Sequence, residues 1–523
     1  MKKKILITTP IYYVNGKPHI GHVYSSLIAD VFARTKRSLW YNVKFSTWVD
    51  ENSQKTVQKA EEMWKDVCEY LDEISQEHKN IWDTYNISYT DFIRTSSEKH
   101  KKVVQKILEK TKKKWYIYKA KYTGFYCVGC EAFKKEEDLI EIPDPESSLG
   151  WQIKVCPDHL KEPNHIEEEN YFFKLKEFEW FLKDLYKNNS DFVIPANRFN
   201  EVKSFVEQWV EDFSISREWK NFWIKFPFDE NHTVYVWYDA LFNYYTVTLD
   251  DNLKELWYFD NTYHVIGKDI AKFHSIYRPA MLKAVDLPIP KKIFTTWFFV
   301  VDWQKMSKSL WNVIEPLELL KKYGRDAISL YLFYDIKIGK DWDFSYSRFE
   351  DVYNNVLIWW WWNLVYRIWK LSQKFGIWKW KLYNNLLTDE LKENNLLNAI
   401  FENKLEKLLE NMLDNVDYQN YLKDWYELVQ ATNKFVQDTQ VWKIIKEDED
   451  KWKEILEYSV YLIHKINLLS SFFLIDAYKK VNEAFNFKNI DNSQNISNFA
   501  EEINKQEVEI ISNPKIIYKK LED

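Results

Sequence analysis

Residues 5–22 read Ile5-Leu6-Ile7-Thr8-Thr9-Pro10-Ile11-Tyr12-Tyr13-Val14-Asn15-Gly16-Lys17-Pro18-His19-Ile20-Gly21-His22, and the rest of the chain is arranged around them. The apolar run up to Val14 predicts a buried strand, and the four residues after it predict the turn that ends this strand. From Val23 to Tyr41 apolar residues recur at helical spacing, which predicts a helix. His19 and His22 are therefore expected between a strand end and a helix start, where backbone N–H groups attract phosphate.

Two imidazoles at that place can donate hydrogen bonds to a phosphate whose negative charge grows in a transition state. Two polar loop residues without a function would look the same, so the histidines alone do not decide the matter. A second motif favours phosphate chemistry. Lys305-Met306-Ser307-Lys308-Ser309 places two ammonium groups on a short polar loop, which suits a triphosphate.

These two motifs resemble the signatures of class I aminoacyl-tRNA synthetases, and the sequence segments around them resemble those of the methionyl-tRNA synthetase family. The resemblance also rests on residues 8–16, on Tyr235-Val236-Trp237-Tyr238-Asp239-Ala240-Leu241 and on His264-Val265-Ile266-Gly267-Lys268-Asp269-Ile270. It implies a methionine–tRNA ligase. Such an enzyme activates L-methionine with ATP to methionyl adenylate and pyrophosphate, then transfers methionine to the 3′ end of tRNA(Met). Two alternatives remain: another class I synthetase, such as a cysteine-specific one, or a catalytically impaired tRNA-binding relative.

The resemblance also implies roles for individual residues. His19 and His22 would stabilise the α-phosphoryl charge, while Lys305 and Lys308 would hold the β- and γ-phosphates with Mg²⁺. Gly21, Gly267 and Asp269 would complete the ATP site. Asp50 would bind the methionine ammonium, although a helix N-cap aspartate is the alternative. The methionine pocket implied by the family consists of Ile11, Tyr13, Asp50, Trp237, Ala240, Leu241, Tyr244, Ile270 and His274.

An aromatic and aliphatic box suits a polarizable thioether. Each apolar member of the pocket could equally be an ordinary core residue, and only the whole set favours a binding site. The residues Asn52-Ser53 depart from the His-Gly that is more common in the family at this point.

The chain of 523 residues is too long for one core and indicates three or four domains. Alternating strands and helices predict an α/β fold with a doubly wound, Rossmann-like parallel sheet, split between 1–115 and 231–320. Residues 116–230 would be an inserted connective-peptide domain, which in the family helps to place the tRNA acceptor end. Its brevity leaves no room for a hydrolytic editing domain, which favours methionine over branched amino acids. A linker would span 321–345.

Residues 346–523 are expected to form an α-helical bundle, because apolar residues recur at three- and four-residue spacing. The resemblance implies that this bundle binds the anticodon. Asn363 and Arg367 resemble the family's anticodon contact, and Trp442 resembles the Trp that stacks on an anticodon base. The alternative for all three residues is an ordinary bundle surface. No further domain is expected after the bundle, so the protein is expected to be a monomer.

The insertion contains Cys127-Val128-Gly129-Cys130 and Cys156-Pro157-Asp158-His159. Three thiolates and an imidazole would make a closed tetrahedral zinc site, which is typical of a structural metal. The alternative is free cysteines without a metal. The resemblance implies one structural Zn²⁺ per chain, held by Cys127, Cys130, Cys156 and His159.

No apolar stretch is long enough for a membrane span, and the apolar run after the N-terminal lysines is too short for a signal peptide. With few cysteines, a reducing cytoplasm is the expected location. The net charge of −6 does not exclude tRNA binding if basic side chains cluster on one face.

Glycine and tryptophan counts are unusual, with 9 Gly and 26 Trp, whereas glycine makes up about 7% of ordinary proteins. Positions where the resemblance implies glycine carry tryptophan instead: Trp40, Trp48, Trp64, Trp209, Trp223, Trp297, Trp303, Trp311 and Trp342. Our hypothesis is that UGA codons meaning glycine in the source were translated as tryptophan. The alternative is a genuinely Trp-rich protein. Four adjacent indoles, Trp359 to Trp362, match no helix or strand period and favour recoding, while Trp82, Trp237 and Trp442 are expected to be genuine.

Overall fold

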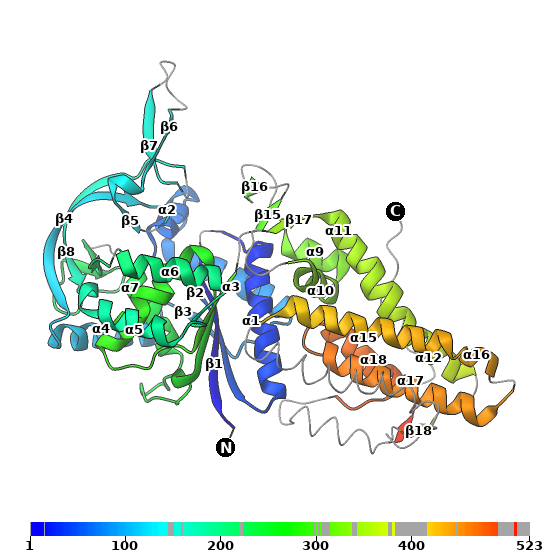
Figure 1. The fold of residues 1–523 in the computed structure, drawn as a ribbon. Coiled ribbons are helices and arrows are strands. Elements are labelled where there is room, and N and C mark those ends of the chain that lie inside the picture. Colours follow the sequence, from blue (N-terminus) through cyan, green and yellow to red (C-terminus); the bar gives the residue numbers. More distant parts are fainter. Residues whose placement is uncertain are drawn as a thin grey trace.

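The computed structural model describes residues 2–14, 16–130, 132–144, 151–157, 160–208, 210–218, 223–296, 299–301, 304–305, 314–336, 342–374, 379–381, 416–444, 447–489 and 507–509. At 299–301, 304–305, 342, 379–381 and 507–509 only the backbone is described. The α/β expectation is confirmed. A parallel six-stranded sheet lies beside a smaller antiparallel sheet on one side and a helical bundle on the other (Figure 1).

The parallel sheet has the order β3-β2-β1-β13-β14-β9. Its strands are β1 (Lys4–Tyr13), β2 (Asn42–Asp50), β3 (Asp91–Arg94), β9 (Val193–Ile194), β13 (Thr262–Gly267) and β14 (Lys292–Thr296). The apolar run of β1 is central because it pairs with both β2 and β13. The register of β1 against β2 shifts between Thr8 and Ile11. Pro10 lies in that shift, where its missing N–H costs no ladder bond.

Helices cover this sheet and lead away from its strand ends. Helix α1 lies between the sheet and the bundle (Figure 1). It begins at Ile20, three residues before the predicted start, so His22 belongs to its first turn. The helices of this part are α1 (Ile20–Ser38), α2 (Gln54–Glu62), α3 (Val67–Thr84), α4 (Glu98–Lys113), α7 (Val236–Thr246), η3 (Phe259–Asn261), η4 (Lys268–Ile270), the π-helix η5 (Phe273–Tyr277) and α8 (Arg278–Ala284).

The middle of the chain forms the antiparallel sheet β10-β8-β4-β5 and a projecting hairpin, β6-β7. Its strands are β4 (Ile117–Cys127), β5 (Ala132–Lys134), β6 (Ile140–Pro143), β7 (Gln152–Val155), β8 (Asn164–Phe173), β10 (Phe213–Ser214), β11 (Ser216–Glu218) and β12 (His232–Val234). The helices η1 (Glu136–Asp138), η2 (Leu175–Phe178), α5 (Glu179–Asn188) and α6 (Ala196–Gln208) complete this part. Strand β9, from the same stretch of sequence, pairs with β14 as an edge of the parallel sheet.

Beyond β14 the chain forms short strands and then helices. The strands are β15 (Phe299–Val301), β16 (Gln304–Lys305), β17 (Trp342–Phe344), β18 (Lys379–Lys381) and β19 (Glu507–Glu509). The helices are α9 (Pro316–Tyr323), α10 (Arg325–Asp335), α11 (Tyr346–Asp351), η7 (Val352–Trp362), α12 (Asn363–Lys374), α15 (Tyr418–Asp438), α16 (Val441–Ile444), α17 (Glu449–Ser470) and α18 (Ile475–Phe485). Within the described residues, no helix is long and apolar enough to cross a membrane.

The four adjacent indoles lie in η7, a π-helix, with Trp361 and Trp362 buried and Trp359 exposed. This segment is therefore helical, against the expectation that it fits no period. The reason is packing: the Trp361 and Trp425 rings meet edge to face at 5.7 Å, inside the bundle core.

Tryptophan also occupies backbone positions that disfavour side chains. Trp40, Trp64, Trp115 and Trp257 have φ of 66°, 55°, 64° and 62°, in the left-handed region that glycine adopts most easily. The first three directly follow the cap residues of α1, α2 and α4. All four side chains are exposed.

A buried ion pair joins the parallel sheet's first helix to the later helices. Asp30 of α1 accepts from Arg325 of α10 at 2.8 Å and from Arg34 at 2.8 Å. Asp30 and Arg325 are almost completely buried. The two guanidinium groups hold the pKa of Asp30 below its usual value, although burial opposes this. The Arg325 guanidinium also donates to the backbone oxygens of Tyr85 and Phe473.

Removing the carboxylate charge should destabilise the whole chain, because Arg325 would keep a buried charge without its counter-ion. We expect Asp30→Asn to lower the free energy of unfolding by about 3 kcal/mol, measured by urea denaturation. The exposed pair Lys59–Glu62 supplies a control, and Lys59→Gln should cost less than about 0.5 kcal/mol. Equal effects of the two substitutions would contradict this role of Asp30.

Candidate active site

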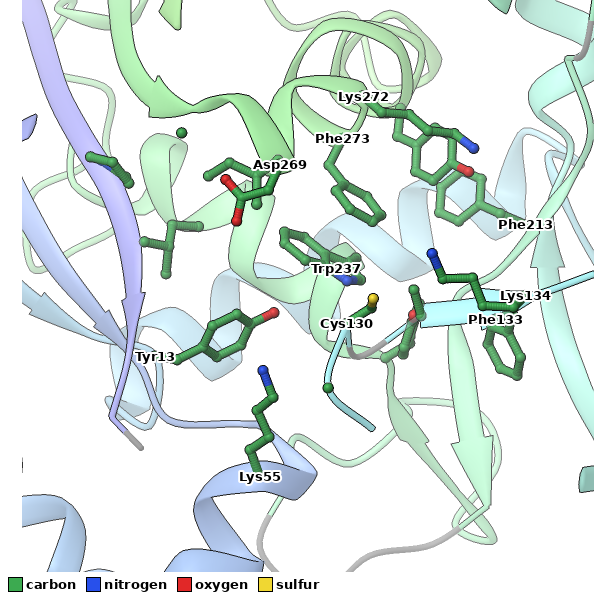
Figure 2. A pocket seen from close by; sticks show the side chains of 18 of the residues that line it. Tyr13, Lys55, Cys130, Phe133, Lys134, Phe213, Trp237, Asp269, Lys272 and Phe273 are labelled. Atoms are coloured by element: carbon green, nitrogen blue, oxygen red, sulfur yellow. The ribbon is translucent and has the colours of Figure 1, made fainter. Parts of the chain in front are cut away.

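A cavity of about 1680 Å³ lies at the carboxyl ends of β1 and β13, and the antiparallel sheet forms its outer wall. One side is lined by residues that the sequence predicted for the site: Ile11, Tyr13, His19, Gly21, His22, Trp237, Gly267, Asp269 and Ile270. The carboxyl ends of parallel strands are the usual place for ligands in such sheets. Figure 2 shows Tyr13, Trp237 and Asp269 facing this cavity from three different elements.

The two histidines begin helix α1 with a reciprocal cap. The backbone N–H of Gly21 donates to His19 Nδ1 at 3.1 Å, and the backbone N–H of His19 donates to His22 Nδ1 at 3.0 Å. Because each Nδ1 is an acceptor, each neutral ring carries its proton on Nε2. Burial, together with His19 and His78 nearby, lowers the pKa of His22 well below its usual value, so its ring is neutral. The ring centroids lie 3.9 Å apart, which gives two adjacent Nε2–H donors.

The residues expected for methionine form two layers. Tyr13 and Trp237 line the cavity with rings edge to face at 6.3 Å, and Trp237 stacks on Phe273 at 3.7 Å (Figure 2). Ala240, Leu241, Tyr244 and His274 are buried and do not line the cavity. The Tyr244 hydroxyl bonds His274 Nε2 at 2.7 Å, and His274 Nδ1 lies 3.0 Å from the Ile270 carbonyl. A carbonyl only accepts, so His274 Nδ1 carries the proton and Tyr244 donates.

Asp50 ends β2 and is buried. It is accompanied by a second carboxylate, Asp239, which sequence reasoning missed. Asn52 connects them, because its backbone N–H donates to Asp50 Oδ1 at 3.3 Å and its side chain donates to Asp239 Oδ2 at 2.7 Å. Burial and the Asp50 charge raise the pKa of Asp239 well above its usual value. The sequence signal that could have identified Asp239 is its position within the otherwise apolar and aromatic segment 235–241.

A second missed feature lies behind the methionine set. The fully buried Arg278 donates to His264 Nε2 at 2.7 Å and to the Leu241 carbonyl at 3.1 Å. His264 therefore keeps its proton on Nδ1, which lies 2.7 Å from the Thr8 hydroxyl. No acidic side chain pairs with Arg278 among the residues that the structure describes, and burial lowers its pKa to about 9. The sequence offered no signal for this network, which joins residues far apart.

Gly267 ends β13, Asp269 follows in η4, and both line the cavity. A Cβ atom at position 267 would overlap the Asp269 carboxylate, so only glycine leaves this side chain its place. In the second phosphate motif, Lys305 lies in β16, whose backbone pairs with Val300. Lys308 lies outside the described residues, as do Trp297, Trp303 and Trp311.

The three clustered cysteines come together in space. The Sγ atoms of Cys127, Cys130 and Cys156 lie within 4.8 Å of one another, and Cys127 and Cys156 are buried. Cys130 Sγ and Cys156 Sγ are 3.5 Å apart, too far for a disulfide and close to the spacing of about 3.8 Å between thiolates around one Zn²⁺. This set fits a metal site. His159 lies outside the described residues.

The residues expected for the anticodon lie on the bundle, remote in sequence from the cavity. Asn363 begins α12 with an exposed side chain. Arg367, half-buried, donates to Asn433 Oδ1 of α15 at 3.0 Å. Trp442 lies on α16 with 40% of its side chain exposed. No interaction recorded for the described residues joins Trp442 to the other two.

Two family profiles match the chain. One, described as tRNA synthetases class I (M), covers residues 5–369, and the other, described as the anticodon binding domain of methionyl tRNA ligase, covers 388–523. The methionine–tRNA ligase of Thermotoga maritima is 35% identical over 505 residues, which are 95% of this chain and 77% of that protein. The methionine–tRNA ligase of Synechocystis sp. is 36% identical over 87% of this chain and 84% of its own length.

Solved structures agree with these relatives. The Mycobacterium tuberculosis methionyl-tRNA synthetase bound by methionyl-adenylate superposes with a TM-score of 0.89 and 26% identity, covering 98% of this chain and 99% of that chain. A second structure of that enzyme in complex with methionyl-adenylate gives a TM-score of 0.85 and 27% identity, over 92% of this chain and 94% of that chain.

Proposed function

This chain belongs to the methionyl-tRNA synthetase family of class I aminoacyl-tRNA synthetases and is a methionine–tRNA ligase, and from that premise we propose which of its residues carry the reaction. The observation that supports the assignment most directly is the reciprocal cap of His19 and His22. It places the proton of each ring on Nε2, where it can be donated to an anionic group beside helix α1, whose N-terminus adds a favourable dipole.

In the first step, the methionine carboxylate attacks the α-phosphorus of ATP, and the bond to pyrophosphate breaks. His19 and His22 hold the oxygens on which negative charge grows, and Lys305 and Lys308 hold the departing pyrophosphate. Gly21, Gly267 and Asp269 contact the nucleotide. When bound, Mg²⁺ supplies further charge neutralisation on the phosphates. In the second step, a ribose hydroxyl at the tRNA 3′ end attacks the adenylate carbonyl, and AMP leaves.

The methionine site is proposed around Asp50, whose carboxylate receives the ammonium group. Ile11, Tyr13, Trp237 and Ile270 would contact the substrate from the cavity wall. Ala240, Leu241, Tyr244 and His274 would form the layer behind them. Burial lowers the pKa of both His274 and His264, so each ring holds a single proton and is neutral beside the proposed place of the thioether.

The donor at His22 Nε2 can be tested without disturbing the cap at Nδ1. His22→Asn keeps a polar group near the Nδ1 position but has nothing at Nε2, so we expect methionine-dependent ATP–pyrophosphate exchange to fall about 100-fold. His22→Gln places an amide N–H near Nε2 and should retain more activity than His22→Asn.

The matched control is the exposed His165 of β8, where His165→Asn should leave the exchange rate unchanged. Wild-type exchange should require methionine and not cysteine. Equal rates for His22→Asn and wild type would remove His22 from the proposed chemistry.

The tRNA is proposed to contact two separate parts of the chain. Its anticodon would lie on the bundle at Asn363, Arg367 and Trp442, and its 3′ end would enter the cavity. The proposed domains of the chain are 1–115 and 231–320 for catalysis, 116–230 for the insertion, 321–345 for the linker and 346–523 for the bundle. Action as a monomer and a cytoplasmic location stay predictions.

One structural Zn²⁺ is proposed at Cys127, Cys130 and Cys156, with His159 as the fourth ligand. Three thiolates within reach of one another support a closed tetrahedral site that organises the β4–β5 turn and the start of the segment after β7. Such a metal orders a small region that has little apolar core of its own.

Metal content should depend on the cluster and not on cysteine in general. We expect Cys130→Ser to lower zinc well below one per chain and to lower the melting temperature, as measured by elemental analysis and calorimetry. The exposed Cys68 lies apart from the cluster, so Cys68→Ser should keep the wild-type zinc content. Full zinc in Cys130→Ser would contradict the proposed ligand set.

A further inference from the structure

The outer half of the cavity carries a group that the first reaction step does not use. Lys272 lies between η4 and η5, with its Nζ 4.0 Å above the Phe205 ring and 5.6 Å from the Tyr277 ring centroid. It lines the cavity, and no ion pair of Lys272 occurs within the described part of the chain. Its neighbour Lys135, in contrast, is paired with Glu211 at 2.8 Å.

Aromatic rings surround this ammonium group and lead from it into the cavity. Phe213 and Tyr277 stack with centroids 4.2 Å apart and an interplanar angle of 10°. Figure 2 shows Lys272 on a helix of the catalytic part and Lys134 on the opposite β5, with Phe133 and Phe213 beside them. Cations next to flat aromatic faces are the usual combination for binding single-stranded nucleic acid, through phosphates and stacked bases.

The position of Lys272 relates it to the methionine site. Lys272 directly precedes Phe273, the ring that stacks on Trp237, and follows Ile270 of the cavity wall by two residues. A polyanion held by Lys272 would therefore end beside the proposed adenylate site. On the basis of the proposed function, we infer that Lys272 is a positioning residue for the transfer step, binding a backbone phosphate of the single-stranded 3′ end of tRNA.

The charge of Lys272 makes the inference testable by pH. Burial lowers its pKa to about 8, with Lys134 and Lys135 acting in the same direction and Asp138 and Glu211 opposing. The ammonium form, which binds phosphate, therefore predominates below pH 8 and is lost as the pH rises through this value. Transfer at low tRNA concentration should fall over that range, beyond any change in the exchange reaction.

The experiment measures both half-reactions in the full-length enzyme. Lys272→Met should lower kcat/KM for aminoacylation of a tRNA(Met) transcript by about tenfold, with methionine-dependent ATP–pyrophosphate exchange unchanged. Lys272→Arg keeps the charge at all pH values and should retain transfer without the fall near pH 8. Lys283 lies on α8 with its ammonium near the Phe181 ring. Lys283→Met is the matched control, and its activity is expected to equal that of wild type.

The outcomes separate the possible roles. An equal loss of exchange and transfer in Lys272→Met would place the phosphate contact on ATP, and unchanged transfer would remove Lys272 from tRNA binding; either result overturns the inference. A loss in Lys272→Met that Lys272→Arg does not restore would mean packing and not charge, and overturns it as well. Absence of methionine-dependent exchange in wild type would instead contradict the proposed function.

An independent observation carries a second inference, about the residues themselves. After α1, α2 and α4 the chain closes with the same hydrogen bonds: Tyr41 N to Lys36 O, Lys65 N to Ala60 O, and Tyr116 N to Thr111 O. This 6→1 bond is the mark of a helix end whose C′ residue is left-handed and usually glycine. The C′ residues here are Trp40, Trp64 and Trp115.

Three other helix ends in the chain use residues that tolerate this conformation, and Gln440 after α15 is an exception, with φ of 44°. Asn86 follows α3, Asp286 follows α8 and Asn486 follows α18, all with positive φ. Indoles have no such tolerance, and those at Trp64 and Trp115 are 96% and 81% exposed, so no packing compensates for the strain. We infer that the natural residue at Trp40, Trp64, Trp115 and Trp257 is glycine, encoded by UGA.

Peptide mass spectrometry on the protein from its native source tests this directly. Peptides that cover positions 40, 64, 115 and 257 should carry the mass of glycine. Trp82 is the internal control, because its indole is fully buried in the core and should keep the mass of tryptophan. Tryptophan at the four positions would overturn the inference, and so would glycine at 82, because it would break the correlation with backbone conformation. The same spectra would read positions 297, 303 and 311.

Discussion

One buried carboxylate joins the first helix of the parallel-sheet part to the helices that follow that sheet. Asp30 lies on α1, the helix that His19 caps. Its carboxylate forms ion pairs with Arg34 of the same helix and with Arg325 of α10. Arg325 passes the connection on to the loop after α3 and to the turn before α18. Its neighbour Asp326 accepts hydrogen bonds from the N–H groups of Asp476 and Ala477 in the first turn of α18. The helix that presents the histidines therefore shares one charge cluster with the bundle, and neither can shift without leaving charge unpaired in the interior.

In the proposed site, hydrogen bonds from backbone and side-chain groups set the positions of the ring protons of four histidines. Main-chain N–H groups fix the tautomers of His19 and His22, a main-chain carbonyl fixes His274, and Arg278 fixes His264. The two N–H donors lie at the start of α1, Ile270 ends η4, and Arg278 begins α8. The site thus has its donors oriented before a substrate arrives, and this is the property that lets fixed dipoles stabilise developing charge.

Much of this arrangement could be predicted from the sequence, because it rests on local patterns. The apolar run before His19, the helical spacing after it and the cysteine pairs are all local signals, and the resemblance supplied roles for Asp50 and Trp237. What could not be predicted depends on long-range contacts. Asn52 meets Asp239 across 187 positions, and Arg278 meets a histidine and a carbonyl from two other elements.

The tryptophans also show what cannot be predicted from the sequence, because their backbone conformation and packing appear only in the structure. The resemblance to the family implied glycine at Trp40 and Trp64, whereas Trp115 and Trp257 enter the proposal only through their backbone angles. Trp48, which the resemblance also marked as a glycine position, is fully buried in β2 and donates to the Thr9 carbonyl at 3.1 Å. An indole there fits its surroundings, so conformation and packing separate cases that sequence alone treats alike.

The thiol cluster has a consequence beyond the stability of the insertion. Cys130 lines the same cavity as His19 and Trp237, together with Gly129 before it and Pro157, which follows Cys156. The cysteine cluster is thus part of the wall of this cavity. Loss of the proposed zinc, or oxidation of its thiolates, would therefore alter the wall of the cavity that contains the proposed methionine and ATP sites, and not only the fold of the insertion.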